Sequence, residues 1–411
     1  MNNFTASALA QRVPSKPSIA TILLILGAMI ANISHATVNR IPTPIQEVQT
    51  TSMRSFHETT ELAESLWSNL TTQFVSLYEQ GKYQAAYDAA SRAYTIAENS
   101  FGLEDVNTAD SLLKLGIINQ TLGNLIVAED NLLGALVILE EKLSPDHPDV
   151  AVVLSNLGNV YFELKRPKDS EKYHRLALKI RENALGALNP SVAQSNYNLA
   201  VLYENQGDYD KAAALYQKAI NLWSQTLGPT HPYVGNALSN LSNTYIAQSK
   251  FSKAAQVIQR TIDFKKSVFG LEHQEVAQSL INLGALYVEQ GQYSPAGTAY
   301  AEALQIAKHL LNSSDPQLAL LMYSLANVYH SQASSHIDAT NNNISKQAST
   351  QYEDIKLLQQ AVPLYQQAAQ ILDSEDSNKP ALDVILSELA LVYKAMGNTD
   401  MAMATESRIT H

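Results

Sequence analysis

Asparagine side chains recur along this chain at a constant interval of 42 residues. The four members, each directly before a leucine of a predicted helix, are Asn156, Asn198, Asn240 and Asn282. Asparagine inside a helix costs about 0.5 kcal/mol relative to alanine, so four in register need a reason. An amide offers one acceptor and two donors and can therefore hold a peptide backbone without reading its side chains. The alternative is a structural role, with each amide bonded to the adjacent repeat or to water, and the two roles can coexist.

Neutral polar and aromatic residues are predicted to surround this row on the same helix faces. The further peptide-binding candidates are Asn159, Asn243, Asn327, Tyr197 and Tyr323. Additional lining residues are Gln194, Asn236 and Gln278, with Glu163, Glu204 and Glu289 at the edge. Only Lys114 adds a basic group to this lining. An extended neutral or basic segment is therefore the expected partner.

Catalytic and metal-binding signals are weak. The stretch from His57 to Glu61 is similar to a zinc-protease helix but has glutamate in place of the second histidine. His147, His231 and His273 fall in the turns between predicted repeats, where a helix-capping role is the better interpretation. No glycine-rich phosphate loop and no organised Ser/His/Asp set occurs. We expect no enzyme activity, no catalytic residue, no cofactor and no metal.

The elements that position the asparagines follow from the same period. Tight turns recur at Gly81, Gly123, Lys165, Gly207, Ser249 and Gly291, and tyrosines at Tyr161, Tyr203, Tyr245, Tyr287 and Tyr329. A period of this size indicates a solenoid, in which each repeat buries its apolar face only against its neighbours. The predicted fold class is all-α.

One repeat, residues 146 to 186, shows how each unit is built. Its first helix carries an apolar stripe at spacings of three and four, from Val150 to Leu164. Pro167 suits the first turn of the second helix, and Gly186 ends that helix. Second helices carry alanine in two columns, which lets neighbouring helices approach closely. The columns are Ala86, Ala128, Ala212, Ala254, Ala296 and Ala93, Ala135, Ala177, Ala219, Ala303.

The segment Asn198–Tyr203, followed by Gly207-Asp208-Tyr209 and by spaced alanines, resembles the tetratricopeptide repeat. The 42-residue step, with Leu227-Gly228-Pro229-Thr230-His231-Pro232 between copies, is similar to the longer kinesin-light-chain type. The resemblance covers roughly residues 60 to 408 and implies a right-handed superhelical solenoid of about seven antiparallel helix pairs. It implies that first helices line the inner wall and that an asparagine ladder holds extended peptides there. The Lys and Arg residues that grip a terminal carboxylate in chaperone-binding members of the family are missing, so acidic C-terminal ligands are not expected.

The ends of the chain and one interruption complete the expected organisation. We predict a signal peptide over 1–36, a linker over 37–57 and the solenoid over 58–411. A polar run at 334–351 is expected to be a disordered or flexible excursion, either an ornament or a lid over the groove, and Pro363 to kink the resumed helix or mark its start. Residues 378–411 are expected to form a terminal capping pair.

The N-terminus predicts export. Arg12 and Lys16 precede an apolar run from Ile19 to Ile33 that is short for a membrane span, and Ser34-His35-Ala36 fits cleavage after Ala36. The alternative is an uncleaved N-terminal membrane anchor. Without residues 1–36 the net charge of −11 becomes −13, which disfavours nucleic acid, and zero cysteines exclude a disulfide framework.

The sequence therefore predicts an exported, periplasmic or secreted scaffold that binds an extended peptide segment or partner protein in a concave groove. The mature chain is not expected to insert into a membrane. The alternative is a structural or assembly component of an envelope complex that uses its ends or convex face, with no peptide in the groove. The sequence does not indicate the oligomeric state.

Overall fold

The computed structural model describes residues 57–340, 347–373 and 378–409. The predicted signal peptide and all but the last residue of the predicted linker lie outside the described residues. Sixteen helices and no strand occur within the described ranges, so the predicted all-α class is confirmed. Taken two at a time along the chain, seven pairs of consecutive helices pack within one or the other of two compact units, in agreement with the roughly seven expected. The described chain divides into two compact units, with the boundary between Gln248 and Ser249.

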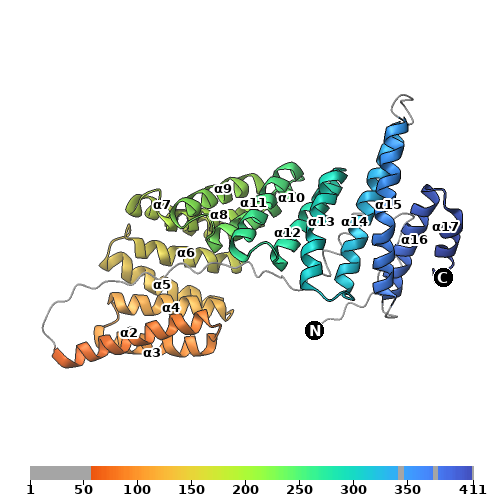
Figure 1. The fold of residues 1–411 in the computed structure, drawn as a ribbon. Coiled ribbons are helices and arrows are strands. Elements are labelled where there is room, and N and C mark those ends of the chain that lie inside the picture. Colours follow the sequence, from red (N-terminus) through yellow and green to blue (C-terminus); the bar gives the residue numbers. More distant parts are fainter. Residues whose placement is uncertain (1–56, 341–346, 374–377, 410–411) are drawn as a thin grey trace. The chain divides into compact units, whose positions relative to one another are not determined.

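The N-terminal unit contains nine helices among its described residues (Figure 1). They are α2 (His57–Glu79), α3 (Tyr83–Phe101), α4 (Val106–Thr121), α5 (Leu125–Lys142), α6 (Pro148–Glu163), α7 (Pro167–Leu185), α8 (Pro190–Asn205), α9 (Tyr209–Thr226) and α10 (Pro232–Ala247). Each helix packs on the next one along the chain, as a solenoid requires.

The C-terminal unit contains seven helices among its described residues. They are α11 (Phe251–Phe269), α12 (Gln274–Glu289), α13 (Tyr293–Leu310), α14 (Pro316–Thr340), α15 (Gln347–Leu372), α16 (Lys379–Ala395) and α17 (Thr399–Glu406). Consecutive helices again pack on one another. The short α17 packs on α16 and ends the described chain, so a helix pair does lie where the terminal pair is expected.

A column of capping side chains starts the first helices of six successive repeats. The Nδ1 atoms of His147, His231 and His273 accept hydrogen bonds of 3.1–3.3 Å from the backbone N–H two residues later. Carboxylate or amide oxygens of Asp105, Asn189 and Asp315 do the same at 2.8–2.9 Å. The capping interpretation of the three histidines is therefore confirmed, and it requires an unprotonated Nδ1.

Close packing between paired helices depends on small residues, as the alanine columns predict. All ten column alanines are completely buried. Glycine does the same work on first helices: a Cβ at Gly158 would lie 2.6 Å from the buried His174 ring. The turns between paired helices adopt positive φ, at Gly207 (79°) and even at Lys165 (60°).

The polar run at 334–351 differs from its expected form. Helix α14 continues to Thr340 and α15 already begins at Gln347, so both described parts of this run are helical. These are the two longest helices described, with 25 and 26 residues, and they pack on each other. Pro363 lies inside α15 and does not mark its start. Serine, alanine and glutamine are tolerated in helices, and antiparallel pairing supplies the stability that the polar composition does not predict.

Candidate functional site

The amides of the N-terminal unit are positioned by first helices and are mostly engaged within the protein. Asn156 on α6 is buried, and its Nδ2 donates to the Val152 carbonyl at 2.9 Å. Asn198 on α8 is half-buried, and its Nδ2 donates to Ser155 Oγ at 3.2 Å. Its Oδ1 accepts from Gln194 Nε2 at 2.8 Å. One N–H of the Asn198 amide therefore remains for a ligand.

Asn240 on α10 repeats the bond between repeats with a different acceptor. Its Nδ2 donates to the Tyr197 hydroxyl at 2.9 Å and, more weakly, to the Tyr216 hydroxyl at 3.4 Å. The bonds Asn198–Ser155 and Asn240–Tyr197 each join a residue to one 43 positions earlier, so two amides bridge successive repeats. These bonds are the structural role named above as the alternative. Peptide binding by the same amides stays a prediction, for which Asn240 keeps its Oδ1 acceptor.

The hydroxyl groups that contact Asn240 belong to a polar network centred on Glu204. Glu204 accepts hydrogen bonds from the Tyr216 hydroxyl at 2.7 Å and from Thr244 Oγ1 at 2.9 Å. Burial raises the pKa of Tyr197 to about 12, and burial beside the Glu204 carboxylate raises the pKa of Tyr216 further. Both hydroxyls therefore keep their protons throughout the physiological range and act as fixed dipoles.

In the C-terminal unit the amide row reaches solvent. Asn282 on α12 is exposed, and its Oδ1 accepts from Gln278 Nε2 at 3.1 Å across one helical turn. Both amides border a hollow of about 380 Å³ that α12, α13 and α14 enclose. The apolar lining of the hollow comprises Ala277, Ile281, Ala285, Ala307, Leu310, Leu311 and Leu321, and its remaining polar lining His273, Gln274, Gln317 and Ser324. Ser324 stands 42 residues after Asn282 and so continues the row with a hydroxyl.

The remaining site candidates differ in burial and in hydrogen bonding. Tyr323 and Asn327 on α14 are buried, and Asn327 Oδ1 accepts a short hydrogen bond from the Tyr365 hydroxyl. Tyr197 is buried as well. Asn159 is half-buried and Asn243 is exposed, and the side chain of neither makes a hydrogen bond to another described residue.

Lys114 occupies the position 42 residues before Asn156, but it forms a buried ion pair with Asp110 one turn earlier on α4. A paired, buried ammonium group is a poor ligand for a terminal carboxylate, because a ligand would have to displace Asp110. The row therefore presents amides and hydroxyls without a free basic group.

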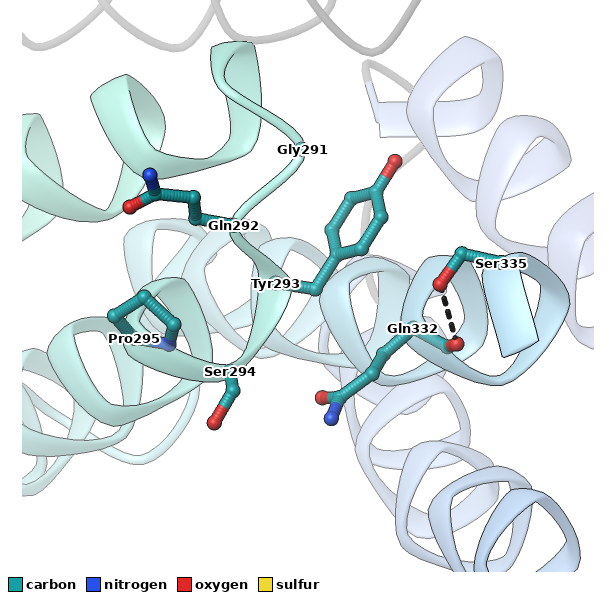
Figure 2. Close-up of a pocket in the computed structure, with 7 residues that line it drawn as sticks. All are labelled: Gly291, Gln292, Tyr293, Ser294, Pro295, Gln332 and Ser335. Carbon is teal, nitrogen blue, oxygen red and sulfur yellow. Dashed lines mark hydrogen bonds between the residues drawn. The ribbon is translucent and has the colours of Figure 1, made fainter. Parts of the chain in front are cut away.

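A second hollow, which the sequence analysis missed, lies elsewhere in the C-terminal unit (Figure 2). It has a volume of about 390 Å³ and lies between the start of α13 and the second half of α14. Gln292, Tyr293 and Ser294 line one side, and Gln332 and Ser335 the other. Its residues share no column with the asparagines, so the 42-residue period gave no signal for it.

Two further features are absent from the described residues. No group of three or more His, Asp or Glu side chains in these ranges is arranged to hold a metal ion. None of the described helices is both long and apolar enough to span a membrane.

These packed helix pairs, with capped first helices and small residues between helices, define a helical repeat protein of the solenoid class. The family model described as tetratricopeptide repeat matches residues 111–183, 191–267 and 275–339, which is more than half of the chain. The chain belongs to the tetratricopeptide repeat family. The fold is typical of proteins that bind other proteins.

Curated relatives are distant and much longer. A clustered mitochondria protein homolog of Aspergillus oryzae is 25% identical over 133 residues, which cover 30% of this chain and 11% of that protein. A homolog of Coccidioides immitis is 27% identical over the same length, 30% of this chain and 10% of its own. The chain thus spans about a tenth of the length of these relatives.

Solved structures with similar folds include kinesin-light-chain-like proteins. BtubC (BKLC) from P. vanneervenii is 21% identical with a TM-score of 0.45, covering 59% of this chain and 92% of that one. A putative kinesin light chain with nearly identical TPR-like repeats from Podosopora anserina is 21% identical with a TM-score of 0.39, covering 54% and 93%. PilW, a type IV pilus biogenesis factor, is 17% identical with a TM-score of 0.44, covering 62% and 96%. Likeness at this level concerns the fold alone.

Proposed function

We propose that this protein is an exported scaffold that binds an extended peptide segment along the faces of its first helices. The observation that carries the proposal is the exposed amide pair Gln278–Asn282 at the border of the 380 Å³ hollow. The pair keeps an N–H donor on Asn282 and acceptor capacity on Gln278 free of partners in the described chain. An extended backbone can satisfy both.

The hollow suggests how a peptide would be held as well as oriented. Its walls are mainly alanine, leucine and isoleucine side chains, and its polar groups lie in a few places. Concave sites of this composition bind by burying an apolar group while a few polar atoms fix its direction. We therefore assign the amide pair to the peptide backbone and the hollow to one apolar side chain of the same segment.

The expected charge of the ligand follows from the absence of a free basic group in the asparagine row. Lys114 is already neutralised by Asp110, while the chain as a whole carries a net charge of −11. A strongly acidic peptide would be repelled by this surface, whereas a neutral or basic one would not. The proposal uses no catalytic residue and no cofactor, because the amides act only as hydrogen-bonding groups.

Export is the second part of the proposal and rests on the basic and apolar pattern of residues 1–36. A periplasmic or secreted location follows if the segment is cleaved after Ala36, and a membrane-anchored one if it is not. Fractionation of the native host, with N-terminal sequencing of the recovered protein, separates these outcomes.

A library of nine-residue peptides tests the groove directly. Peptides are varied one position at a time and measured by fluorescence polarisation against the protein without residues 1–36. We expect a preference for an aliphatic residue at one position and tolerance elsewhere, because the amides read only backbone. Asn282→Ala should lower the affinity for the best-binding peptide by about fivefold or more, which corresponds to the loss of about one hydrogen bond.

The matched control is Asn221→Ala on α9. Asn221 accepts from Gln217 at 2.8 Å in the same i, i+4 arrangement and is exposed, but it lies on a second helix and does not line the hollow. Its replacement should leave peptide affinity unchanged. Equal losses in the two variants, or no peptide bound at all, would exclude the groove as the binding site.

A further inference from the structure

The outer faces of the second helices can be compared position by position, because the repeats serve as internal controls. Two positions eleven residues apart point outward on each helix. On five helices both are exposed and polar: Gln84 and Thr95, Lys168 and Lys179, Asp210 and Asn221, Ser252 and Asp263, Ser294 and Gln305. On α5 the same positions are Ile126 and Val137, which are 61% and 64% exposed. Of the six helices compared, α5 alone therefore carries apolar side chains at these two positions.

The apolar residues of α5 form a stripe. Ile126, Leu133 and Val137 are spaced by seven and four residues, which places them on one face of the helix, and Val127 beside them is 49% exposed. A single exposed hydrophobic residue needs no explanation, whereas a row of them marks a surface that another molecule covers. Leu133 is half-buried and packs on the core, whereas burial within this chain does not account for Ile126, Val127 and Val137.

The next second helix, α7, carries a basic row at the corresponding positions. Lys168, Lys172, Arg175 and Lys179 are all exposed, in a chain whose net charge is −11. The three lysines form no ion pair within the described residues. Arg175 pairs with Glu171 at 2.8 Å.

The apolar and basic rows belong to one surface of the N-terminal unit. Both α5 and α7 pack on α6. An ion pair of 3.2 Å joins Arg166, directly before α7, to Glu129 on α5. Because the rows occupy equivalent positions of successive repeats, they run alongside each other at matching heights.

We propose that the outer faces of α5 and α7 form a docking surface for an acidic amphipathic helix of a partner protein. The partner's apolar side covers Ile126, Leu133 and Val137, and its carboxylates reach the lysines of α7. The stripe spans eleven residues, or about 16 Å and three helical turns, which matches one helix laid along it. This surface is separate from the first-helix groove and does not rest on the function proposed for it.

Two other occupants fit the surface less well. The exposed carboxylate of Asp130 lies between Ile126 and Leu133, and an anionic bilayer would have to bury and repel it, whereas a partner helix can place a polar side chain opposite it. A second copy related by a two-fold axis perpendicular to the rows would set one basic row against the other. Charge complementarity therefore favours an acidic partner.

The test uses the protein without residues 1–36 and a synthetic 18-residue helical peptide with leucine along one face and glutamate on one flank. Binding is measured by fluorescence anisotropy at two salt concentrations. Ile126→Ser with Val137→Asn, residue types that other repeats carry at these positions, should weaken binding at least about tenfold through lost apolar burial. The thermal midpoint should not fall, because both side chains are exposed in the free protein.

Charge variants and a matched control complete the experiment. Lys168→Glu with Lys179→Glu should weaken binding at least about tenfold. The affinity should also depend less on the salt concentration, because less electrostatic attraction is left for salt to screen. Asp210→Ser with Asn221→Ser changes the same outer positions on α9 and should leave binding unchanged. A peptide with glutamine in place of glutamate should bind the parent protein more weakly.

Three results would overturn the proposal. One is peptide binding that is absent or equal in all variants. Another is binding of phosphatidylglycerol vesicles that depends on Ile126 and Val137 while the peptide does not bind. The third is a dimer, seen by sedimentation equilibrium, that the same double substitution dissolves. Asn282→Ala should leave binding of the acidic helix intact, so failure here and failure of the groove are distinguishable.

Discussion

Replacing two members of the asparagine row by alanine should affect local stability to different extents. Asn240→Ala removes a 2.9 Å hydrogen bond to the hydroxyl of the buried Tyr197. Loss of such a bond costs about 0.5–1.5 kcal/mol, and somewhat more if the hydroxyl is left unsatisfied. Alanine returns about 0.5 kcal/mol of helix propensity. We expect a net loss of about 0.5–1 kcal/mol in the free energy of unfolding of this region.

Asn282→Ala removes much less. The exposed amide has one hydrogen bond with Gln278 across a helical turn, and such pairs contribute about 0.2–0.5 kcal/mol. The gain of about 0.5 kcal/mol in propensity offsets this loss or exceeds it. Asn221→Ala on α9 breaks the same kind of pair with Gln217 and is the matched control. Both variants should be neutral or slightly more stable.

Hydrogen exchange followed by mass spectrometry over a urea series reads these effects repeat by repeat. Local measurement is necessary because solenoids lose stability largely through neighbouring interfaces and need not unfold in one step. Amides of α8 to α10 should open more easily in Asn240→Ala, and those of α12 should not in Asn282→Ala. Equal destabilisation by both substitutions would refute the division of the row into a bridging part and an exposed part.

Two further predictions concern buried tyrosines. The Tyr300 hydroxyl is buried with no hydrogen-bond partner among the described residues, so Tyr300→Phe should raise the free energy of unfolding by about 1 kcal/mol. Tyr216→Phe removes a hydrogen bond to Glu204 and should lower the free energy of unfolding by a similar amount. Urea denaturation measures both changes. Stability should also fall as pH rises above about 10, because the pKa of Tyr197 is raised to about 12 by burial. The folded state then retains a proton that the unfolded chain releases, which favours unfolding by up to about 1.4 kcal/mol per pH unit for each such tyrosine. Stability that stays constant to pH 11.5 by circular dichroism would contradict this linkage.

The period alone is enough to predict most of the fold. A step of 42 residues places turns, caps and alanine columns in register, and these local signals depend on backbone geometry that each repeat reproduces. The capping role of His147, His231 and His273 could be predicted because a cap acts on the backbone two residues away. Such short-range interactions can be predicted without knowing how the repeats pack against one another.

The direction of each amide could not be predicted in the same way, because it depends on the residue 43 positions earlier. Asn198 meets Ser155, and Asn240 meets Tyr197, so identical residues in one column acquire different partners. The signal was present in the column preceding the asparagines, where a hydroxyl-bearing side chain can accept from the next repeat. The helical parts of 334–351 were missed for a related reason, since pairing of α14 with α15 stabilises a composition that reads as polar coil.

The same period that fixes the fold makes departures from it informative. A solenoid repeats its backbone, so any column that changes chemistry in one repeat alone has no explanation in the architecture common to all repeats. Ile126 and Val137 stand where five other helices carry polar groups, and the exposed Asn282 stands where Asn156 is buried. Stability constrains the shared features, whereas recognition of a particular partner requires features that only one place on the surface possesses. Binding specificity in this chain is therefore expected at the exceptions to its repeat pattern, on the outer face of α5 and at the hollow beside Asn282.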